Sequence, residues 1–314
     1  MSNHGPSLRR RALRAVASAN RFLTGCQGDE GTWRDYELEP GPSDAWITAC
    51  VGHALLRGSS IPRARAAALH RAAQALLAGK RPAGWGYNSR TACDADSTSW
   101  ALRFLARMRA LQDVSATSLL GAYTTSNGGI RTFASPERFG SWAGEHTEVT
   151  ALAGLALLAA GERRGVDRLR AAVLATWADD QGWHPFWWRT DTYVRAQSLE
   201  FLLASGGIPA HVAAAERARL SRSPVPVSSF ERALTLAIGV YTGAAQTSEL
   251  AASLLGMQSA DGGWPASAVL LVPDQRDASR HLVYSDKRRA LSTAMAIHAL
   301  RTWLVVDQPK DSAR

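Results

Sequence analysis

The sequence has few of the features that mark membrane, secreted or disulfide-linked proteins. Its 3 cysteines, Cys26, Cys50 and Cys93, stand far apart in 314 residues, which argues against a disulfide framework and a cysteine-based zinc site. No uncharged apolar run reaches the roughly 18 residues that a membrane-spanning helix needs, and the most apolar stretch, 150–160, is too short. Residues 1–11 carry arginine but no following apolar segment, unlike a signal peptide. We therefore expect a cytoplasmic protein without an integral membrane span.

Lysine is also scarce, so most of the 36 basic residues are arginine. The net charge of +9 is typical of nucleic-acid binders. However, the arginines are scattered over many predicted helices and form no continuous patch. We expect no nucleic-acid partner, while attraction for an anionic small substrate stays open.

Signature motifs for cofactors and common hydrolases are missing as well. The chain has no Walker, Rossmann or Gly-x-Ser-x-Gly motif. What the chain does contain is a 46% hydrophobic composition with turn signals between long helical patterns, and almost no strand patterns. We expect an all-α domain over residues 1–306 and a disordered tail over 307–314.

Twelve helices are predicted, and they alternate between helices with a charged face and helices that are apolar over most of their circumference. Their ranges are 7–26, 43–58, 62–79, 95–111, 114–124, 146–161, 165–178, 191–205, 208–221, 227–242, 246–258 and 286–304.

A turn motif recurs between these helices at roughly 50-residue spacing, which is typical of a repeat architecture. Residues 27–33 and 258–264 both read Q-x-x-x-G-x-W, and degenerate copies stand at 83–85, 127–129 and 180–183. We expect glycine to end each outer helix in a left-handed cap, and tryptophan and glutamine to clamp the turn onto its neighbours. Six helical hairpins of this kind close into a single (α/α)6 barrel of six inner and six outer helices; an open solenoid is the alternative.

An acidic pair opens the predicted helix 95–111. Asp94 and Asp96 follow the Gly84-Trp85-Gly86-Tyr87 turn, and two carboxylates this close oppose each other's ionisation. In a desolvated site one of them holds its proton at neutral pH and acts as an acid. The alternative is a helix cap, because aspartate in the first turn complements the helix dipole.

These turns, together with the D-x-D-S-T sequence after G-W-G-Y, resemble the squalene-hopene cyclase and class II terpene cyclase superfamily. The resemblance covers essentially the whole chain, as one barrel. That family's acid motif is usually D-x-D-D-T, whose middle aspartate protonates an alkene or epoxide, and a D-x-D-T-T form occurs in cyclases that make drimane skeletons. It implies that Asp96 is the general acid and Asp94 the first carboxylate, while Ser97 departs from the pattern.

The motifs of related chemistries are absent. Asp179 and Asp180 are followed by Gln181-Gly182-Trp183, so the D-D-x-x-D motif of ionisation-type terpene synthases does not occur, and the zinc set of protein prenyltransferases is not recognisable. A proton is then the initiator, and we expect no metal and no other cofactor.

The register of the inner helices predicts which residues face the barrel axis. The helices align on Thr48, Thr98, Thr150, Arg195, Arg232 and Thr293. Two residues earlier stand the side chains expected at the mouth: Trp46, Asp96, Glu148, Tyr193, Phe230 and Leu291. Asp96 and Glu148 come from neighbouring helices and so can share a proton, which raises one pKa. The aromatic rings offer π faces to a carbocation; the alternative is that they are core.

Seven residues further along each helix, roughly 10 Å deeper, lies a more polar level: His53, Arg103, Leu155, Glu200, Ala237 and His298. One reading is a paired-charge floor that closes the barrel, and another is a pocket for a substrate head group, with Trp100 on the same face as Arg103. A metal set of His53, Glu200 and His298 lacks motif spacing.

Residues 183–189 form the densest aromatic cluster, and loop 125–145 adds Phe133, Phe139 and Trp142. We expect Trp187 and Trp188 either to form a lid that excludes water or to clamp the repeat. Arg189, Arg195 and Arg232 lie near the same end and either bind an anion or pair with Asp191, Glu231 and Glu148.

The leading hypothesis is protonation-initiated cyclisation or isomerisation of a small isoprenoid-bearing substrate, with Asp96 as general acid and Asp94, Ser97 and Glu148 tuning its proton. The alternatives are a non-catalytic barrel that binds a lipid, peptide or carrier partner, and acid–base catalysis on a non-terpenoid substrate. Peripheral membrane contact and the oligomeric state are left open.

Overall fold

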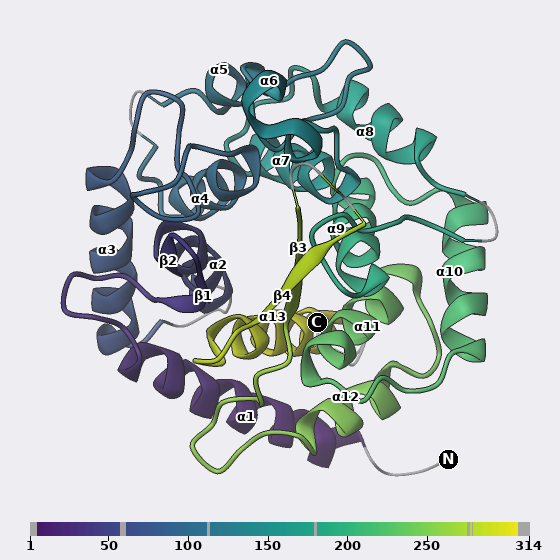
Figure 1. Cartoon of the computed structure of the whole chain (residues 1–314). Coiled ribbons are helices and arrows are strands. Elements are labelled where there is room, and N and C mark those ends of the chain that lie inside the picture. Colours follow the sequence, from purple (N-terminus) through teal and green to yellow (C-terminus); the bar gives the residue numbers. More distant parts are fainter. Residues whose placement is uncertain are drawn as a thin grey trace.

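The helices of the computed structural model, which describes residues 5–56, 61–111, 114–178, 181–274, 277 and 279–306, form two concentric rings (Figure 1). The inner ring consists of α2 (Ala45–Leu56), α4 (Ala95–Arg107), α7 (Thr147–Ala159), α9 (Asp191–Ala204), α11 (Ser229–Thr242) and α13 (Ala290–Val306). The outer ring consists of α1 (Gly5–Gly25), α3 (Arg63–Ala78), α5 (Ala116–Gly121), α8 (Val166–Ala175), α10 (Ala210–Arg222) and α12 (Thr247–Leu255).

The inner ring is closed. Each inner helix packs against the next one, and α13 packs against both α11 and α2. Burial differs between the two rings as expected. The inner helix α7 is buried at every position from Glu148 to Leu157, whereas the outer helix α10 buries only Val212, Glu216 and Leu220. The predicted (α/α)6 barrel is therefore confirmed, and the open solenoid is wrong.

All twelve predicted helices are present, with ends displaced by a few residues. The largest difference is at 114–124, where the helix is reduced to α5, because Ser115 caps its first turn and Tyr123 already belongs to the next turn. The predicted tail at 307–314 and the motif residues Asp179 and Asp180 lie outside the described residues. Among the helices described, none is long and apolar enough to cross a membrane.

The repeated turn is fixed by three sets of hydrogen bonds. The indole N–H of Trp33 donates to the Leu23 carbonyl at the end of the preceding outer helix, and Trp85, Trp183 and Trp264 donate in the same way. The aligned threonine of the following inner helix accepts the backbone N–H of the motif tryptophan, as Thr48 does from Trp33 at 2.9 Å. Gln27 and Gln258 donate to the next outer helix as well. The expected clamp is thus made by tryptophan, glutamine and threonine together.

The motif glycine has a different role from the one expected. Gly31 and Gly262 do have positive φ (87° and 93°), but they lie several residues beyond the ends of α1 and α12 and do not cap them. A Cβ on Gly31 would come within 2.7 Å of the Arg71 carbonyl oxygen on α3, and one on Gly262 would meet the Ser18 backbone on α1. Glycine is required here because the turn lies directly against the neighbouring outer helix.

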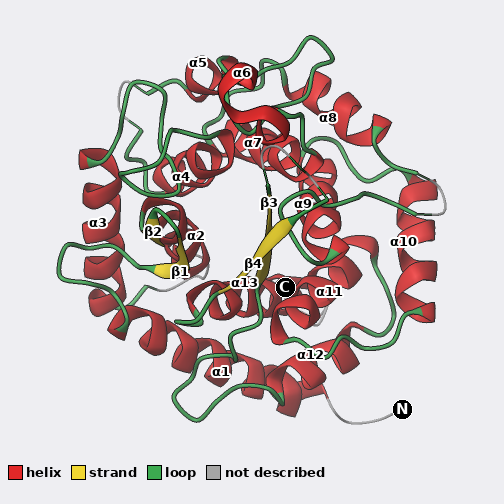
Figure 2. Cartoon of the chain, in the orientation of Figure 1, coloured by secondary structure: helices red, strands yellow, loops and turns green. Residues whose placement is uncertain are grey.

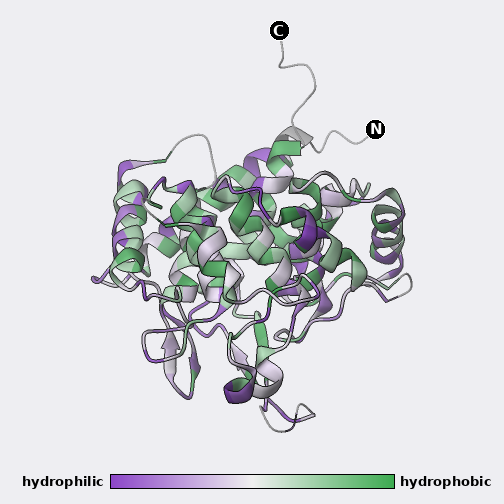
Figure 3. Cartoon of the chain, turned by 90° about the horizontal axis from the view of Figure 1, so that it is seen from above, coloured by the Kyte–Doolittle hydropathy of each residue, from purple (hydrophilic) through white to green (hydrophobic). Residues whose placement is uncertain are grey.

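Two antiparallel hairpins interrupt the all-α pattern, and the sequence patterns did not predict them. They are β1 (Asp35–Leu38) with β2 (Gly41–Ser43), and β3 (Val269–Pro273) with β4 (His281–Ser285). In Figures 1 and 2 the β3–β4 hairpin crosses the centre of the ring, and Figure 3 shows the strands projecting from one end of the barrel. The short α6 (Pro136–Phe139) and the 3₁₀ turn η1 (Gly140–Ala143) belong to the long loop before α7.

The first and last repeats are joined by long-range polar contacts. The buried Asp35 carboxylate accepts the backbone N–H groups of Arg288 and Ala290 at 2.9 and 2.8 Å. Arg9 donates to the Leu304 carbonyl at 2.7 Å. The Asp35 bonds hold the start of α13 and the β1 hairpin together, whereas Arg9 on α1 bonds the last turn of α13.

Candidate functional site

The two aspartates at the start of α4 have separate environments. Asp94 is the N-cap: it accepts the Ser97 backbone N–H at 2.6 Å and the Ser97 hydroxyl at 2.8 Å. Burial raises the pKa of Asp94 to about 6, and the bonds from Ser97 oppose that shift. The cap reading therefore describes Asp94, and Ser97 holds that carboxylate in place.

Asp96 takes no part in the cap and lies among the inner helices. Burial, which is the largest cause, and then the neighbouring Asp94 and Glu148 carboxylates raise the pKa of Asp96 well above its usual range. The Trp46 indole N–H lowers it to a smaller extent. Protein surrounds Asp96, yet the residue keeps some accessible surface.

Glu148 on α7 links this acidic pair to the aromatic loop. Its Oε1 atom accepts the backbone N–H groups of Phe186 and Trp187 at 2.8 and 3.0 Å. Among the described residues, no hydrogen-bond donor reaches its buried Oε2 atom. Burial raises the pKa of Glu148 while both N–H donors lower it. These donors favour the ionised form of Glu148, whereas Asp96 has only the contact with Trp46 to favour its own ionised form.

The predicted aromatic residues at the mouth do meet, and Trp188 joins them. The Trp188 ring centroid lies 4.2 Å from Tyr193, 5.2 Å from Phe230 and 6.3 Å from Trp46. Its side chain is 4% exposed, so it is buried among these rings. Leu291, the sixth residue of the predicted ring, is also buried.

Two further aromatic residues at this end were missed from the sequence. Tyr36 on β1 lies 5.5 Å from Trp46, and Tyr87 lies 6.2 Å from it. Tyr36 has a positive φ of 48° at a bulge in the hairpin, which turns its side chain into the barrel, where its hydroxyl donates to the Ala268 carbonyl. The position of Tyr87 in the G-W-G-Y motif was the available signal; for Tyr36 the bulge gave none.

The aromatic loop divides between the two predicted roles. Trp183 is the turn clamp described above, whereas residues 187–189 pair with strand β3: Leu271 N–H donates to the Trp187 carbonyl, and Arg189 N–H to the Val269 carbonyl. Trp142 donates to the Pro273 carbonyl at 2.6 Å and lies 5.6 Å from the Trp187 ring. This loop and the β3–β4 hairpin thus cover the mouth together.

The Trp187 side chain is held by a small polar network. Its indole N–H donates to the Thr132 hydroxyl at 3.1 Å, and this hydroxyl also bonds the His146 Nδ1 atom at 2.8 Å. The His146 ring stacks on Phe186 at 3.7 Å, and burial lowers the pKa of His146 to about 3. His146 is therefore neutral and acts as part of the cover.

The deeper polar level is also present. Arg103 forms a buried ion pair with Glu200, and the Nε2 atom of His298 lies 3.6 Å from the same carboxylate. The His53 ring stacks on His298 at 6.3 Å and meets the edge of Trp100 at 5.7 Å. The Arg103 guanidinium lies 5.3 Å from the Trp100 ring centroid. These residues form a continuous layer across the barrel.

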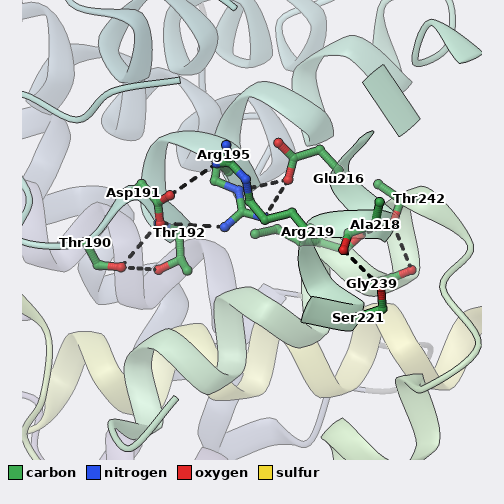
Figure 4. Close-up of polar contacts among 11 residues, drawn as sticks. Thr190, Asp191, Thr192, Arg195, Glu216, Ala218, Arg219, Ser221, Gly239 and Thr242 are labelled. Carbon is green, nitrogen blue, oxygen red and sulfur yellow. Dashed lines mark hydrogen bonds and ion pairs between the residues drawn. The ribbon is translucent and has the colours of Figure 1, made fainter. Parts of the chain in front are cut away.

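The three arginines expected near the mouth each have a partner within the protein. Arg195 donates to Glu216 on α10 at 2.8 and 2.6 Å (Figure 4), and Arg232 bonds the Pro226 carbonyl and Ser253. Burial and then the Asp191 carboxylate raise the pKa of Glu231, and Arg189 lies close enough to oppose that rise. Arg195 and Arg232 thus take partners other than Glu148.

A hollow of about 590 Å³ is lined by residues of α9 to α12 and their loops. Its polar wall includes Asp191, Arg195 and Arg219, which Figure 4 shows pointing toward one another. None of the predicted acid or aromatic residues lines it. Within the described residues, no group of three or more histidine, cysteine, aspartate or glutamate side chains is arranged to hold a metal ion.

Known structures share this architecture. The type II terpene cyclase MstE from Scytonema is 24% identical, with a TM-score of 0.83 over 95% of this chain and 99% of that one. A variant of it in complex with its substrate, geranylgeranyl dihydroxybenzoate, superimposes with a TM-score of 0.81 at 23% identity over the same shares. A possible member of the GH105 family from Klebsiella pneumoniae shares 13% identity, covers 95% of this chain and 94% of its own, and has a TM-score of 0.63.

No model of a protein family matches the chain, and no curated protein matches it in sequence. At these identities the similarity to solved structures establishes the fold.

Proposed function

We propose that this protein is a protonation-initiated cyclase or isomerase of an isoprenoid-bearing substrate, with Asp96 as its general acid. The observation that carries the proposal is the placement of the Asp96 carboxyl between two other buried carboxylates beneath an aromatic cover. A carboxyl in this setting keeps its proton at neutral pH. The similarity to MstE, a terpene cyclase with a prenylated substrate, supports the same reading.

The proposed first step needs only the residues of this chain. The Asp96 O–H bond breaks and its hydrogen forms a C–H bond with one alkene carbon, which leaves a carboxylate and a carbocation. The charge of Glu148 raises the energy of the ionised Asp96 and so keeps Asp96 protonated until the substrate is bound. Asp94 stays on the helix cap, where Ser97 holds it, so Ser97 fits the site without being an acid itself.

The aromatic side chains at the mouth would then stabilise the carbocation. A carbocation needs electron density without a nucleophile, and the faces of Trp46, Tyr193, Phe230 and Trp188 offer this. The cover formed by the aromatic loop and the β3–β4 hairpin keeps water from the cation. A second alkene closes the ring, and loss of a proton to a base ends the reaction.

The test is a pair of matched variants, Asp96→Asn and Asp94→Asn, offered isoprenoid acids, alcohols and diphosphates. We expect Asp96→Asn to abolish product formation while circular dichroism and thermal melting stay near wild type, because Asp96 makes no cap bond. Asp94→Asn is expected to lower the melting temperature and retain part of the turnover. An Asp96→Asn variant that remains active would overturn the proposed role. If no isoprenoid is converted by the wild type, the non-catalytic barrel is favoured.

A further inference from the structure

The hollow lined by α9 to α12 contains a buried hydroxyl group that no other described residue bonds. Thr235 on α11 lines this hollow and is 7% exposed. A threonine inside a helix commonly donates to the carbonyl four residues earlier, as Thr242 does to Ile238 in the same helix at 2.8 Å. Within the described residues, the Thr235 hydroxyl makes neither this bond nor another. It is therefore available to a group bound in the hollow.

A carboxylate lies beside this hydroxyl. Glu231 stands one turn before Thr235 on the same face of α11 and lines the same hollow. Its backbone N–H donates to the Ser228 hydroxyl, but no described residue donates a hydrogen bond to its half-buried carboxylate. Burial and the Asp191 carboxylate raise the pKa of Glu231 more than Arg189 lowers it. A cation placed beside Glu231 would therefore stabilise its ionised form.

The ion pairs of the wall do not supply that cation. Arg195 is bonded to Glu216, and Arg219 lies 3.4 Å from Asp191 (Figure 4). Both guanidinium groups that line the hollow thus have a carboxylate of their own, and the charge of Glu231 comes in addition. A bound anion would meet like charge here, whereas a bound cation would meet opposite charge.

The remaining wall combines a further carboxylate with apolar side chains. Glu249 on α12 also lines the hollow, and Leu220, Val225 and Leu250 give it apolar surface. Its volume of about 590 Å³ lies within the range of roughly 300–1,000 Å³ that is usual for small-molecule sites. These features suit a compound with one positively charged end and an apolar body.

We propose that this hollow binds a small organic ammonium ion, which donates to the Glu231 carboxylate and the Thr235 hydroxyl and packs its apolar body against the apolar side chains of the wall. Two oxygens one helical turn apart are within reach of one ammonium group, because it carries three N–H donors. The site is separate from the one around Asp96, whose acid and aromatic residues do not line it. The inference is independent of the proposed cyclase function.

The test compares three probes by titration calorimetry: hexylammonium, hexanol and hexanoate. They share an apolar body and differ in the charge of the head group. We expect hexylammonium to bind the wild type at least about tenfold more tightly than either of the others, which corresponds to about 1.4 kcal/mol. No binding of the amine, or equal binding of the alcohol or the acid, would overturn the inference.

Glu231→Gln and Asp96→Asn form a matched pair of variants. Each removes one carboxylate, the first from this hollow and the second from the barrel, where the aromatic rings also attract cations. We expect the Kd of hexylammonium to rise at least about tenfold in Glu231→Gln and to stay within about twofold of wild type in Asp96→Asn. The reverse result would place the amine inside the barrel and refute the proposed site.

Thr235→Val tests the hydroxyl without breaking a bond among the described residues. The change removes the oxygen and keeps a branched side chain of similar shape. The Kd of hexylammonium should rise about threefold or more, while the melting temperature stays near wild type. An unchanged Kd would show that the hydroxyl does not contact the ammonium group. A clearly lowered melting temperature would show that the hydroxyl has a structural partner, which would also contradict the proposal.

Discussion

Glu148 combines two tasks that substitution can separate. It bonds the backbone N–H groups of Phe186 and Trp187, and its charge raises the pKa of Asp96. Glu148→Gln keeps an oxygen that can accept both N–H groups but removes the charge. Glu148→Ala removes both the acceptor and the charge.

The two variants should therefore differ in what they change. In Glu148→Gln the loss of a like charge lowers the pKa of Asp96, so activity should decline at a lower pH than in the wild type, with an unchanged product mixture. Glu148→Ala also leaves two N–H groups buried without an acceptor, at about 1–3 kcal/mol each. The loop then opens to relieve this cost, water reaches the carbocation, and hydroxylated products should appear.

The assay is kcat/KM between about pH 5 and pH 9 together with product analysis by mass spectrometry. The sign follows from the need for a protonated acid: activity is present below the pKa of Asp96 and is lost above it. Identical pH profiles and product mixtures for wild type and both variants would refute the reasoning. A shifted profile with hydroxylated products in Glu148→Gln would show that an amide cannot hold the loop.

Two further predictions concern stability. Thr98→Val removes the hydroxyl that accepts the Trp85 backbone N–H, so chemical denaturation should show a loss of about 1–3 kcal/mol; a loss below about 0.5 kcal/mol would mean that the clamp contributes little. Burial, and then the Asp35 carboxylate, raise the pKa of the buried Asp286 to about 7. Because the folded protein binds this proton more tightly than the unfolded chain does, Asp286 favours the folded state most at low pH. The free energy of unfolding should therefore fall between about pH 4 and pH 8, by up to about 4 kcal/mol from this group. Asp286→Asn should reduce the difference in melting temperature between about pH 5 and pH 8, and an unchanged difference would show that another group is responsible.

The ring of helices was predictable because each part of its pattern is local. Helical periodicity marked the segments. The aligned threonines and arginines placed Trp46, Tyr193 and Phe230 at one level, where the structure has them around Trp188. The assignment of Asp94 and Asp96 to different tasks could not be made from a D-x-D pattern, because it depends on which carboxylate Ser97 bonds.

The cover of the mouth was less predictable because it depends on contacts between distant segments. Strand β3 is held by the loop at 187–189, some 80 residues earlier in the chain, and it pairs with strand β4 in a two-stranded sheet. Short two-stranded hairpins are marginal without such support, so their own residues carry little strand signal. The role of Glu148 as acceptor for the Phe186 and Trp187 N–H groups could not be predicted for the same reason, because the donors lie 38 and 39 positions further along the chain.

A closed ring has no end from which to fray. Stacked linear repeats lose their terminal units first, but here α13 is wedged between α11 and α2, and Arg301 donates to the Ala54 carbonyl at 2.7 Å across 247 positions of sequence. Detaching α13 would expose one buried face of α11 and one of α2 at the same time. Unfolding of the inner ring should therefore be all-or-none, and a partly folded intermediate would not keep Asp96 buried.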